Sequence, residues 1–385
     1  MKRFLAKKYN NFKIKHSMKF INQENVIDLS LGDSDLTTDL EVIEKTFIDT
    51  KNGHTHYANP YGLPELRSLL CNSFMEDYQL NYAIDECLIT TSGNHAIWLA
   101  LHAIINKGDE VLILEPYYPF YPQQVKAAGG KPVFVQLESS QGFHLDLDKI
   151  TNSITPKTKA LIINSPNNPT GCCYTKIELE KLAKIVIKHD LVVIADEIYT
   201  HFCYKEKHVP FSAIKNMRDH TILIGSFSKN YVMTGWRVGY IFTNPELIFI
   251  MKEINENNTF TSPTISQKAA IHALNFRNRI QKYLYNQFKE RLFYLYNEIN
   301  KISPLKPLKP EGAIYLFVDI SKTKMTGEDF ANLLLEKGNV AVIPGYSYGN
   351  STKNFIRLTA SRNLKELEIA ISRIKEFVNK FILRK

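Results

Sequence analysis

The middle of the chain repeats one pattern, in which a short apolar run rich in Val, Ile and Leu stops abruptly at Gly, Pro, Asn or an acid. Uniformly apolar runs of this length are typical of strands that are buried on both faces, as in parallel sheets. The five runs are LITTSGN (88–94), EVLILEPYY (110–118), ALIINSPNNPTG (160–171), LVVIADEIY (191–199) and TILIGSFSK (221–229).

Helical patterns separate these runs. NHAIWLALHAII follows Gly93, and TKIELEKLAKIVIKHD opens with Thr175 and Glu178 in the arrangement of a capping box. The alternation of strands and helices predicts an α/β fold whose large domain, residues 45–275, has a mainly parallel, doubly wound sheet flanked by helices.

The last part of the chain, residues 276–385, predicts a smaller α/β domain. A proline-rich connector, SPLKPLKPEG, leads to the strand AIYLFVDI, the helix GEDFANLLLEKG and the strands VAVIP and NFIRLTA. A closing helix carries a core-facing stripe, and an amphipathic stretch over residues 266–302 is expected to bridge the two domains. Residues 1–44 are expected to pack with the small domain. The stripe consists of Leu367, Ile371, Ile374, Val378 and Phe381.

Composition narrows the possible functions. The net charge is +9, but the lysines are spread along the chain among 39 acids, and no nucleic-acid recognition motif accompanies them. A solvated lysine-rich surface is therefore favoured over nucleic-acid binding, with a polyanion contact left open only for the basic segment MKRFLAKKYNNFKIKHSMKF. No apolar run has the length of a membrane helix. Five cysteines without a CxxC pair or a metal-type spacing predict a cytoplasmic protein and no metal site.

Polar side chains collect where the apolar runs end, and open α/β sheets bind ligands at the carboxyl ends of their strands. Together these residues offer an amine, a carboxylate, hydroxyls, an amide and an aromatic face, with Arg237 nearby. A metal site would need more ligands of one kind, and a serine triad would need a placed histidine. The residues are Ser92–Gly93–Asn94, Tyr117–Tyr118, Asn167–Asn168, Asp196 with Tyr199, and Ser226 to Lys229.

This set suits a planar aromatic cofactor that carries a phosphate and a reactive carbonyl, as pyridoxal 5'-phosphate does. The Lys229 amine could form a Schiff base with its aldehyde, and Asp196 could keep the pyridine nitrogen protonated, so that the ring accepts electrons. The phenol of Tyr199 could lie beside the ring oxygen. A phosphate would be bound by a helix N-terminus, hydroxyls and a guanidinium, which are offered by Gly93–Asn94, Ser226 and Arg237.

The segment SFSKNYVMTGWRVGY (226–240) resembles the lysine signature of the class I/II aminotransferases. YANPYGLPELR, NSPNNPTG, ADEIY and NFIRLTAS resemble further motifs of that family, in the family's order. The resemblance covers roughly residues 25–380. It implies an aspartate-aminotransferase-like enzyme of fold type I, which binds pyridoxal phosphate, uses an amino acid and a 2-oxo acid as substrates, and forms a homodimer with active sites at the subunit interface.

The resemblance also implies roles for individual residues. Lys229, Asp196 and Tyr199 would be catalytic. The cofactor would be bound by Ser92, Gly93, Asn94, Tyr118, Asn168, Asp196, Tyr199, Ser226, Ser228, Lys229, Arg237 and Tyr57, with Tyr118 stacking on the ring and Tyr57 reaching the phosphate of the partner subunit. The substrate would be bound by Gly32, Asn168 and Arg357, with Arg357 holding the α-carboxylate.

Each role has a plainer alternative. LVVIADE also resembles the Walker B strand of a nucleotide hydrolase, although no GxxxxGK[ST] loop precedes it. Asn168 lies before a proline and could only form a turn. Tyr57 could be an ordinary loop residue, Gly32 a turn glycine, and Arg357 a member of a structural ion pair.

The predicted reaction is ping-pong transfer of an amino group between an L-amino acid and a 2-oxo acid. Two alternatives stay open: a C–S β-lyase on the same scaffold, and a pyridoxal-phosphate-binding regulator without turnover, which would be expected to carry a DNA-binding extension. The sequence departs from aspartate-preferring relatives at His95, where some of them have a lysine for the distal carboxylate. A strict preference for aspartate is therefore not predicted.

Overall fold

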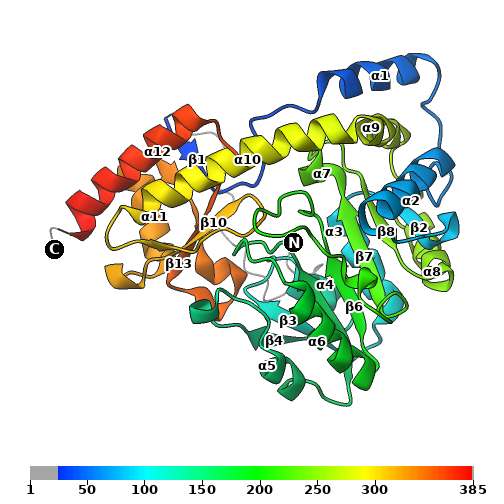
Figure 1. Cartoon of the computed structure of the whole chain (residues 1–385), viewed down its shortest axis with the longest axis horizontal. Coiled ribbons are helices and arrows are strands. Elements are labelled where there is room, and N and C mark those ends of the chain that lie inside the picture. The colour runs from blue at the N-terminus through cyan, green and yellow to red at the C-terminus, as the bar shows by residue number, and fades with distance from the viewer. Residues whose placement is uncertain (1–24, 384–385) are drawn as a thin grey trace, which may run out of the picture.

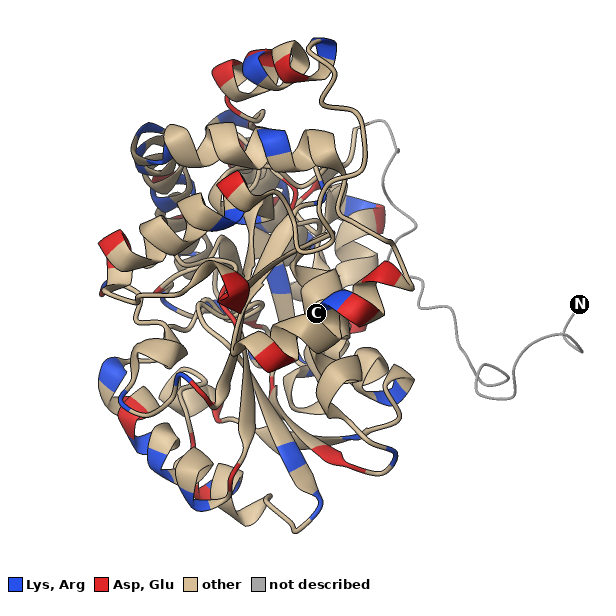
Figure 2. Cartoon of the chain, turned by 90° about the vertical axis from the view of Figure 1, so that its right-hand side faces the viewer, with Lys and Arg blue, Asp and Glu red and all other residues tan. Residues whose placement is uncertain are grey.

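The computed structural model describes residues 25–383 of the 385-residue chain. The basic N-terminal segment, and with it most of the segment 1–44, lies outside the described residues. Within the described part, no helix combines the length and the apolar character that crossing a membrane requires. Figure 2 shows that basic and acidic positions share the same helices on the face in view.

A seven-stranded sheet forms the centre of the larger part of the molecule (Figure 1), in the order β2-β8-β7-β6-β5-β3-β4. Strand β8 runs antiparallel to both of its neighbours, β2 and β7, and the other six strands all run in one direction. The predicted mainly parallel sheet is therefore confirmed. Its strands are β2 (Cys87–Thr90), β3 (Glu110–Glu115), β4 (Lys131–Gln136), β5 (Thr158–Asn164), β6 (Val192–Asp196), β7 (Thr221–Ser226) and β8 (Gly239–Phe242).

Helices cover both faces of this sheet, because alternate strand residues point to opposite sides. Ile194 packs on the face covered by α3 and α8, whereas its neighbour Val193 packs on the face covered by α6. The helices of this part are α1 (Leu40–Lys51), α2 (Pro64–Tyr78), α3 (Gly93–Ile104), α4 (Tyr121–Ala127), α5 (Leu147–Asn152), α6 (Lys176–Lys188), α7 (Phe227–Asn230), α8 (Pro245–Glu256) and α9 (Thr264–Asn275).

The capping box predicted for α6 is present. The hydroxyl of Thr175 accepts a hydrogen bond from the Glu178 backbone N–H at 3.3 Å, and the Glu178 carboxylate accepts one from the Thr175 N–H at 2.8 Å. Two backbone donors that would otherwise lack partners are thereby satisfied.

The smaller part is built on a four-stranded antiparallel sheet in the order β12-β13-β10-β9. The closing helix buries the predicted stripe from Leu367 to Val378, and Phe381 is partly buried against the same core. The elements are β9 (Lys306–Pro307), β10 (Tyr315–Asp319), α11 (Gly327–Gly338), β11 (Val340–Ala341), β12 (Ile343–Pro344), β13 (Phe355–Thr359), α12 (Leu364–Phe377) and a π-helical turn (Val378–Ile382).

The amphipathic stretch predicted over residues 266–302 consists of two helices, α9 and α10 (Arg277–Asn300), which meet at Phe276. The first half of α10 buries its apolar face in the core of the large sheet. The second half buries it in the core of the small sheet (Figure 1). The six residues concerned are Ile280, Leu284 and Phe288, then Leu292, Leu295 and Ile299.

The described part of the N-terminal segment contacts both cores. Strand β1 (Ile27–Asp28) pairs in parallel with β11 of the small part. Helix α1 packs Val42 into the core of the large part, and the expected boundary between residues 44 and 45 falls inside this helix.

Gly239 of β8 lies where the sheet meets the start of α3. A Cβ at this position would lie 2.6 Å from the backbone nitrogen of Gly93 and 2.6 Å from the carbonyl carbon of Ser92. Backbone atoms cannot move aside as a flexible side chain can, so an added methyl group must shift the helix start or the strand.

We therefore expect Gly239→Ala to lower the free energy of unfolding by about 1–3 kcal/mol, the usual cost of overpacking. Urea denaturation followed by circular dichroism measures this. Gly235→Ala is the matched control, because a Cβ there has no neighbour within 4 Å. Equal stability of the two variants would show that the close approach at Gly239 does not constrain the fold.

Candidate active site

A cavity of about 430 Å³ lies at the carboxyl ends of β3, β5, β6 and β7, where the small part faces the large sheet. Nine of the residues predicted for the site line this cavity. They come from the N-terminal segment, from five segments of the large part and from β13: Gly32, Gly93, Asn94, Tyr118, Asn168, Asp196, Tyr199, Lys229 and Arg357.

Asp196, the last residue of β6, is a buried carboxylate with one free oxygen. Its Oδ2 accepts a hydrogen bond from the hydroxyl of Tyr121, whereas its Oδ1 has no partner among the described residues. Burial raises the pKa of Asp196 to about 7, although the hydrogen bonds from Tyr121 and from the Ile198 backbone oppose the shift. The free oxygen of a buried acid can hold a protonated nitrogen.

Lys229 is the only amine among the described residues that line the cavity. It lies in α7, one short turn beyond β7, and its Nζ donates a hydrogen bond to the carbonyl oxygen of Gly32. Position 32 has no room for a side chain, since a Cβ on Gly32 would lie 2.2 Å from the Tyr315 hydroxyl oxygen. The backbone at Gly32 thus faces the amine.

Arg357 is buried in β13 without an acidic partner among the described residues. Its guanidinium donates to Asn168 Oδ1 at 2.8 Å and to the carbonyl oxygen of Ser30, and its Nε has no partner within residues 25–383. It also lies over the ring of Tyr315, 4.2 Å from the centroid. The alternative of a structural ion pair therefore has no support, and a buried cation with a free donor fits an anionic ligand.

The helix start predicted for a phosphate, Gly93 and Asn94, lines the cavity, and the predicted hydroxyls of Ser92 and Ser226 lie next to it. Ser92 caps α3, and its hydroxyl accepts from the His95 N–H at 3.3 Å. Ser226 caps α7, accepts from the Ser228 N–H at 3.1 Å, and lies against the start of α3, 3.3 Å from where a Cβ on Gly93 would be. These groups converge at one place, which a helix N-terminus makes suitable for an anion.

Arg237 and Tyr57 are placed differently from the rest. Arg237 is exposed and does not line the cavity; its Nη1 donates to the Thr234 carbonyl at 2.6 Å. Ser92 and Arg237 both have positive φ angles, 100° and 58°, and such strained backbone often occurs at binding sites. Tyr57 is 83% exposed and lines a separate hollow beside Thr261 to Ile265.

Three aromatic residues at the site were not predicted. Tyr121 holds Asp196, Tyr315 forms a hydroxyl–hydroxyl hydrogen bond of 2.9 Å with Tyr199, and Tyr348 lies beside Arg357. Burial and the neighbouring phenol raise the pKa of Tyr199 well above its ordinary value, so this hydroxyl keeps its proton. A tyrosine within an otherwise apolar strand, as in AIYLFVDI, was the available signal for Tyr315.

His95 lies close to the site but is not among the cavity-lining residues. Its Nδ1 faces the Thr91 N–H at 3.3 Å, its Nε2 is buried without a partner among the described residues, and burial lowers the pKa of the imidazole to about 4. A neutral His95 does not act as a cation for a substrate carboxylate.

Comparison with known proteins agrees with this geometry. The model of the family "Aminotransferase class I and II" matches residues 24–374. An aspartate aminotransferase of Bacillus sp. (strain YM-2) is 37% identical, with 92% of each chain covered. The structure of an aromatic aminotransferase from Pyrococcus horikoshii superimposes with a TM-score of 0.90 at 32% identity, covering 94% of this chain and 97% of that one.

A single mutant of Thermus thermophilus aspartate aminotransferase gives a TM-score of 0.88 at 33% identity, with 91% of each chain covered. The chain belongs to the class I and II aminotransferases, whose members depend in general on pyridoxal phosphate, and it has their fold type I. The predicted family, fold class and aminotransferase activity are thereby confirmed.

Folding raises the pKa of Asp196 from its ordinary 3.8 to about 7, so between these values the folded chain holds a proton that the unfolded chain has released. The free energy of unfolding should therefore fall as pH rises through this window. Without cofactor, we expect the wild type to lose about 2 kcal/mol relative to Asp196→Asn between about pH 5 and about pH 7. Urea denaturation of both proteins measures this difference. If the difference in the free energy of unfolding between the two proteins did not change with pH, the raised pKa of Asp196 would be contradicted.

Proposed function

We propose that the chain transfers an amino group between an L-amino acid and a 2-oxo acid, with pyridoxal 5'-phosphate bound in the cavity. The observation that carries the proposal is the convergence of three groups on one cavity. These are the Lys229 amine, the buried Asp196 carboxylate with its unpartnered Oδ1, and the buried Arg357 guanidinium with its unpartnered Nε.

The residues present fit this cofactor. Asp196 Oδ1 would accept a hydrogen bond from the protonated pyridine nitrogen, and Lys229 is the amine to which the aldehyde would be attached. Tyr118 offers an aromatic face in the cavity wall, and Tyr199 a phenol. The phosphate would lie at the start of α3, held by Ser92, Gly93, Asn94, Ser226 and Ser228. Arg237, whose side chain is exposed and bonded to the Thr234 carbonyl, would turn toward the phosphate when it is bound.

When bound, pyridoxal phosphate supplies a carbonyl that captures an amino group and a ring that withdraws electrons from the substrate α-carbon. The chain's own residues move the protons. Lys229 Nζ, held at the cavity by the Gly32 carbonyl, would remove the α-proton as general base and later return it as general acid. Asp196 would stabilise the positive charge on the ring nitrogen throughout. In the second half of the ping-pong cycle, Lys229 would carry out the same two proton transfers in the reverse order.

Substrate orientation would depend on Arg357 and Asn168. The guanidinium already touches the Asn168 side chain at 2.8 Å, so the two can bind one α-carboxylate together. A bidentate carboxylate would satisfy the free donor of Arg357. The apolar side of the cavity, including Ile97, Phe120 and Ile343, would face the substrate side chain.

Charge at the cavity favours an uncharged substrate side chain. Lys229 and Arg357 are the cations among its described lining residues, and both have other proposed roles. Asp28 and Asp33 also line it and would repel a second carboxylate. Although relatives are named aspartate aminotransferases, we propose that this chain prefers amino acids with apolar side chains.

A homodimer completes the proposed site. Tyr57 is too exposed to serve the cavity of its own chain, and the outer face of the neighbouring α1 leaves Phe47 and Ile48 more than half exposed. Large apolar residues on one face are typical of an interface between copies. Tyr57 would then contact the phosphate group in the partner's cavity.

A cytoplasmic location agrees with five free cysteines in the chain.

We expect the protein loaded with pyridoxal phosphate to absorb visible light, and its band to be lost when an amino acid with an apolar side chain is added. Aspartate should need a concentration at least about tenfold higher, since the described lining residues offer no cation besides Lys229 and Arg357 to offset burial of its second carboxylate. Lys229→Ala should not show this conversion at a measurable rate. Stopped-flow absorption over a panel of amino acids measures both effects.

The outcomes separate the alternatives. Conversion by aspartate at the lowest concentration would overturn the proposed side-chain preference but leave amino transfer in place. Release of pyruvate and ammonia from cysteine conjugates, without a 2-oxo acid, would identify a β-lyase. A band that no amino acid changes would identify a cofactor-binding protein without turnover.

A further inference from the structure

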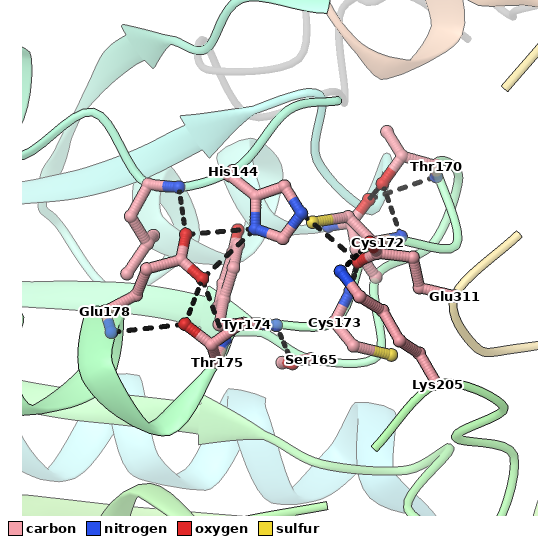
Figure 3. Close-up of polar contacts among 12 residues, drawn as sticks. His144, Ser165, Thr170, Cys172, Cys173, Tyr174, Thr175, Glu178, Lys205 and Glu311 are labelled. Atoms are coloured by element: carbon pink, nitrogen blue, oxygen red, sulfur yellow. Dashed lines mark hydrogen bonds and ion pairs between the residues drawn. The ribbon is translucent and has the colours of Figure 1, made fainter. Parts of the chain in front are cut away.

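His144, Cys172 and Glu311 form a cluster outside the cavity (Figure 3). His144 precedes α5, Cys172 lies in the turn between β5 and α6, and Glu311 ends the connector that leads to β10. One potential ligand atom from each, namely an imidazole nitrogen, a thiol sulfur and a carboxylate oxygen, lies within 4.8 Å of the other two. Because the three residues are far apart in the sequence, their spacing did not predict a metal site.

Glu178 orients the imidazole of His144. Its carboxylate lies 3.0 Å from His144 Nδ1 and also accepts from the Leu145 backbone N–H at 3.1 Å. Nε2 is thereby left to face Cys172 and Glu311, as Figure 3 shows. A carboxylate that holds the far nitrogen of a histidine is the arrangement that fixes metal-binding histidines.

The distances and charges suit a divalent ion. His144 Nε2 lies 3.2 Å from Glu311 Oε2, and two ligands at ~2.0–2.2 Å from a tetrahedral zinc ion are separated by roughly 3.3 Å. A neutral imidazole, a thiolate and a carboxylate together carry a charge that balances Zn²⁺. Thiolate and imidazole ligands in one set favour zinc over magnesium or calcium.

We propose that this cluster is a zinc site, with His144 Nε2, Cys172 Sγ and Glu311 Oε2 as protein ligands and a water molecule as the fourth. Cys172 is buried, whereas the side chains of His144 and Glu311 are about one quarter and one fifth exposed. The ion can therefore reach the site from solvent without opening the core.

The site lies at the junction between the two parts of the molecule. The connector is already bonded to the turn after β5, because the Gly312 N–H donates to the Gly171 carbonyl at 2.8 Å and the Cys173 N–H to Glu311 Oε2 at 3.2 Å. That turn carries Asn168, and the strand after the connector carries Tyr315. A bound ion would fasten together two segments that line the active-site cavity.

Without an ion, the same residues form a hydrogen-bonded ion-pair cluster, in which Lys205 donates to the other oxygen of Glu311 at 2.9 Å. This is the rival explanation. It requires carboxylates and a histidine as charged partners, and the thiol of Cys172 takes part only through a hydrogen bond with His144, not as a thiolate ligand. The two accounts therefore differ in what happens when this thiol is replaced.

The test is equilibrium dialysis of the holoenzyme against zinc chloride, followed by elemental analysis. We expect one zinc ion per chain in the wild type, and at least a tenfold loss of affinity in Cys172→Ser and in His144→Gln. Glu178→Gln should weaken binding by about 10–100-fold through the orientation of His144. Cys173→Ser is the matched control, because it removes an adjacent thiol outside the ligand set, and it should bind as the wild type does.

Cobalt(II) provides a second readout, since its four-coordinate thiolate complexes absorb in the red, where the cofactor does not. The red bands should appear in the wild type and in Cys173→Ser and be absent from Cys172→Ser. Circular dichroism and retained aminotransferase activity show whether each variant is folded. Absence of stoichiometric zinc in the wild type, or equal binding by Cys172→Ser, would overturn the proposal and leave the ion-pair cluster as the explanation.

Discussion

The site depends on the burial of the Asp196 carboxylate at the carboxyl end of β6. An acid removed from water is unfavourable in its charged form, and among the described residues Oδ1 of Asp196 has no hydrogen-bond partner, whereas Oδ2 accepts from the hydroxyl of Tyr121. The other oxygen can be satisfied by a cationic group from a ligand. The remaining parts of the site follow from the same edge of the sheet, where parallel strands bring Lys229 and Asn168 to one cavity.

A second constraint concerns Arg357, which belongs to the small sheet but bonds to Asn168 of the large part. Helix α10 fixes the position of the small part relative to the large part, because the first half of the helix is buried in one core and the second half in the other. The groups proposed to bind the substrate and those proposed to bind the cofactor are thus carried largely by separate sheets, with one continuous helix between them. The proposed zinc site would add a second connection at the connector that ends at Gly312.

Much of this arrangement could be predicted from the sequence. The five apolar runs became β2, β3, β5, β6 and β7, and the polar residues at their ends collect at one cavity, because the carboxyl ends of parallel strands share an edge. Strand β4 was missed because it lies at the edge of the sheet and buries only one of its six residues, and β8 because it is short and begins within the lysine motif. The break at Phe276 has neither proline nor glycine to mark it.

The site residues that were missed share one property: their roles depend on three-dimensional contacts alone. Tyr121 lies in a short helix and does not differ in sequence context from a core tyrosine, and Tyr315 is marked only by its place in an otherwise apolar strand. The metal-type cluster joins three remote segments, so its residues carry no motif. Sequence patterns identified residues at strand ends that the structure brings to one cavity, whereas residues that approach from a second segment needed the structure.

The most direct test of the central claim, that the Lys229 amine holds pyridoxal phosphate, is reduction of the loaded protein with borohydride followed by peptide mass spectrometry. The account predicts that the mass of the reduced cofactor is found on the peptide that contains Lys229 and on no other. Attachment to another lysine, or no attachment after the cofactor has been supplied, would contradict the account.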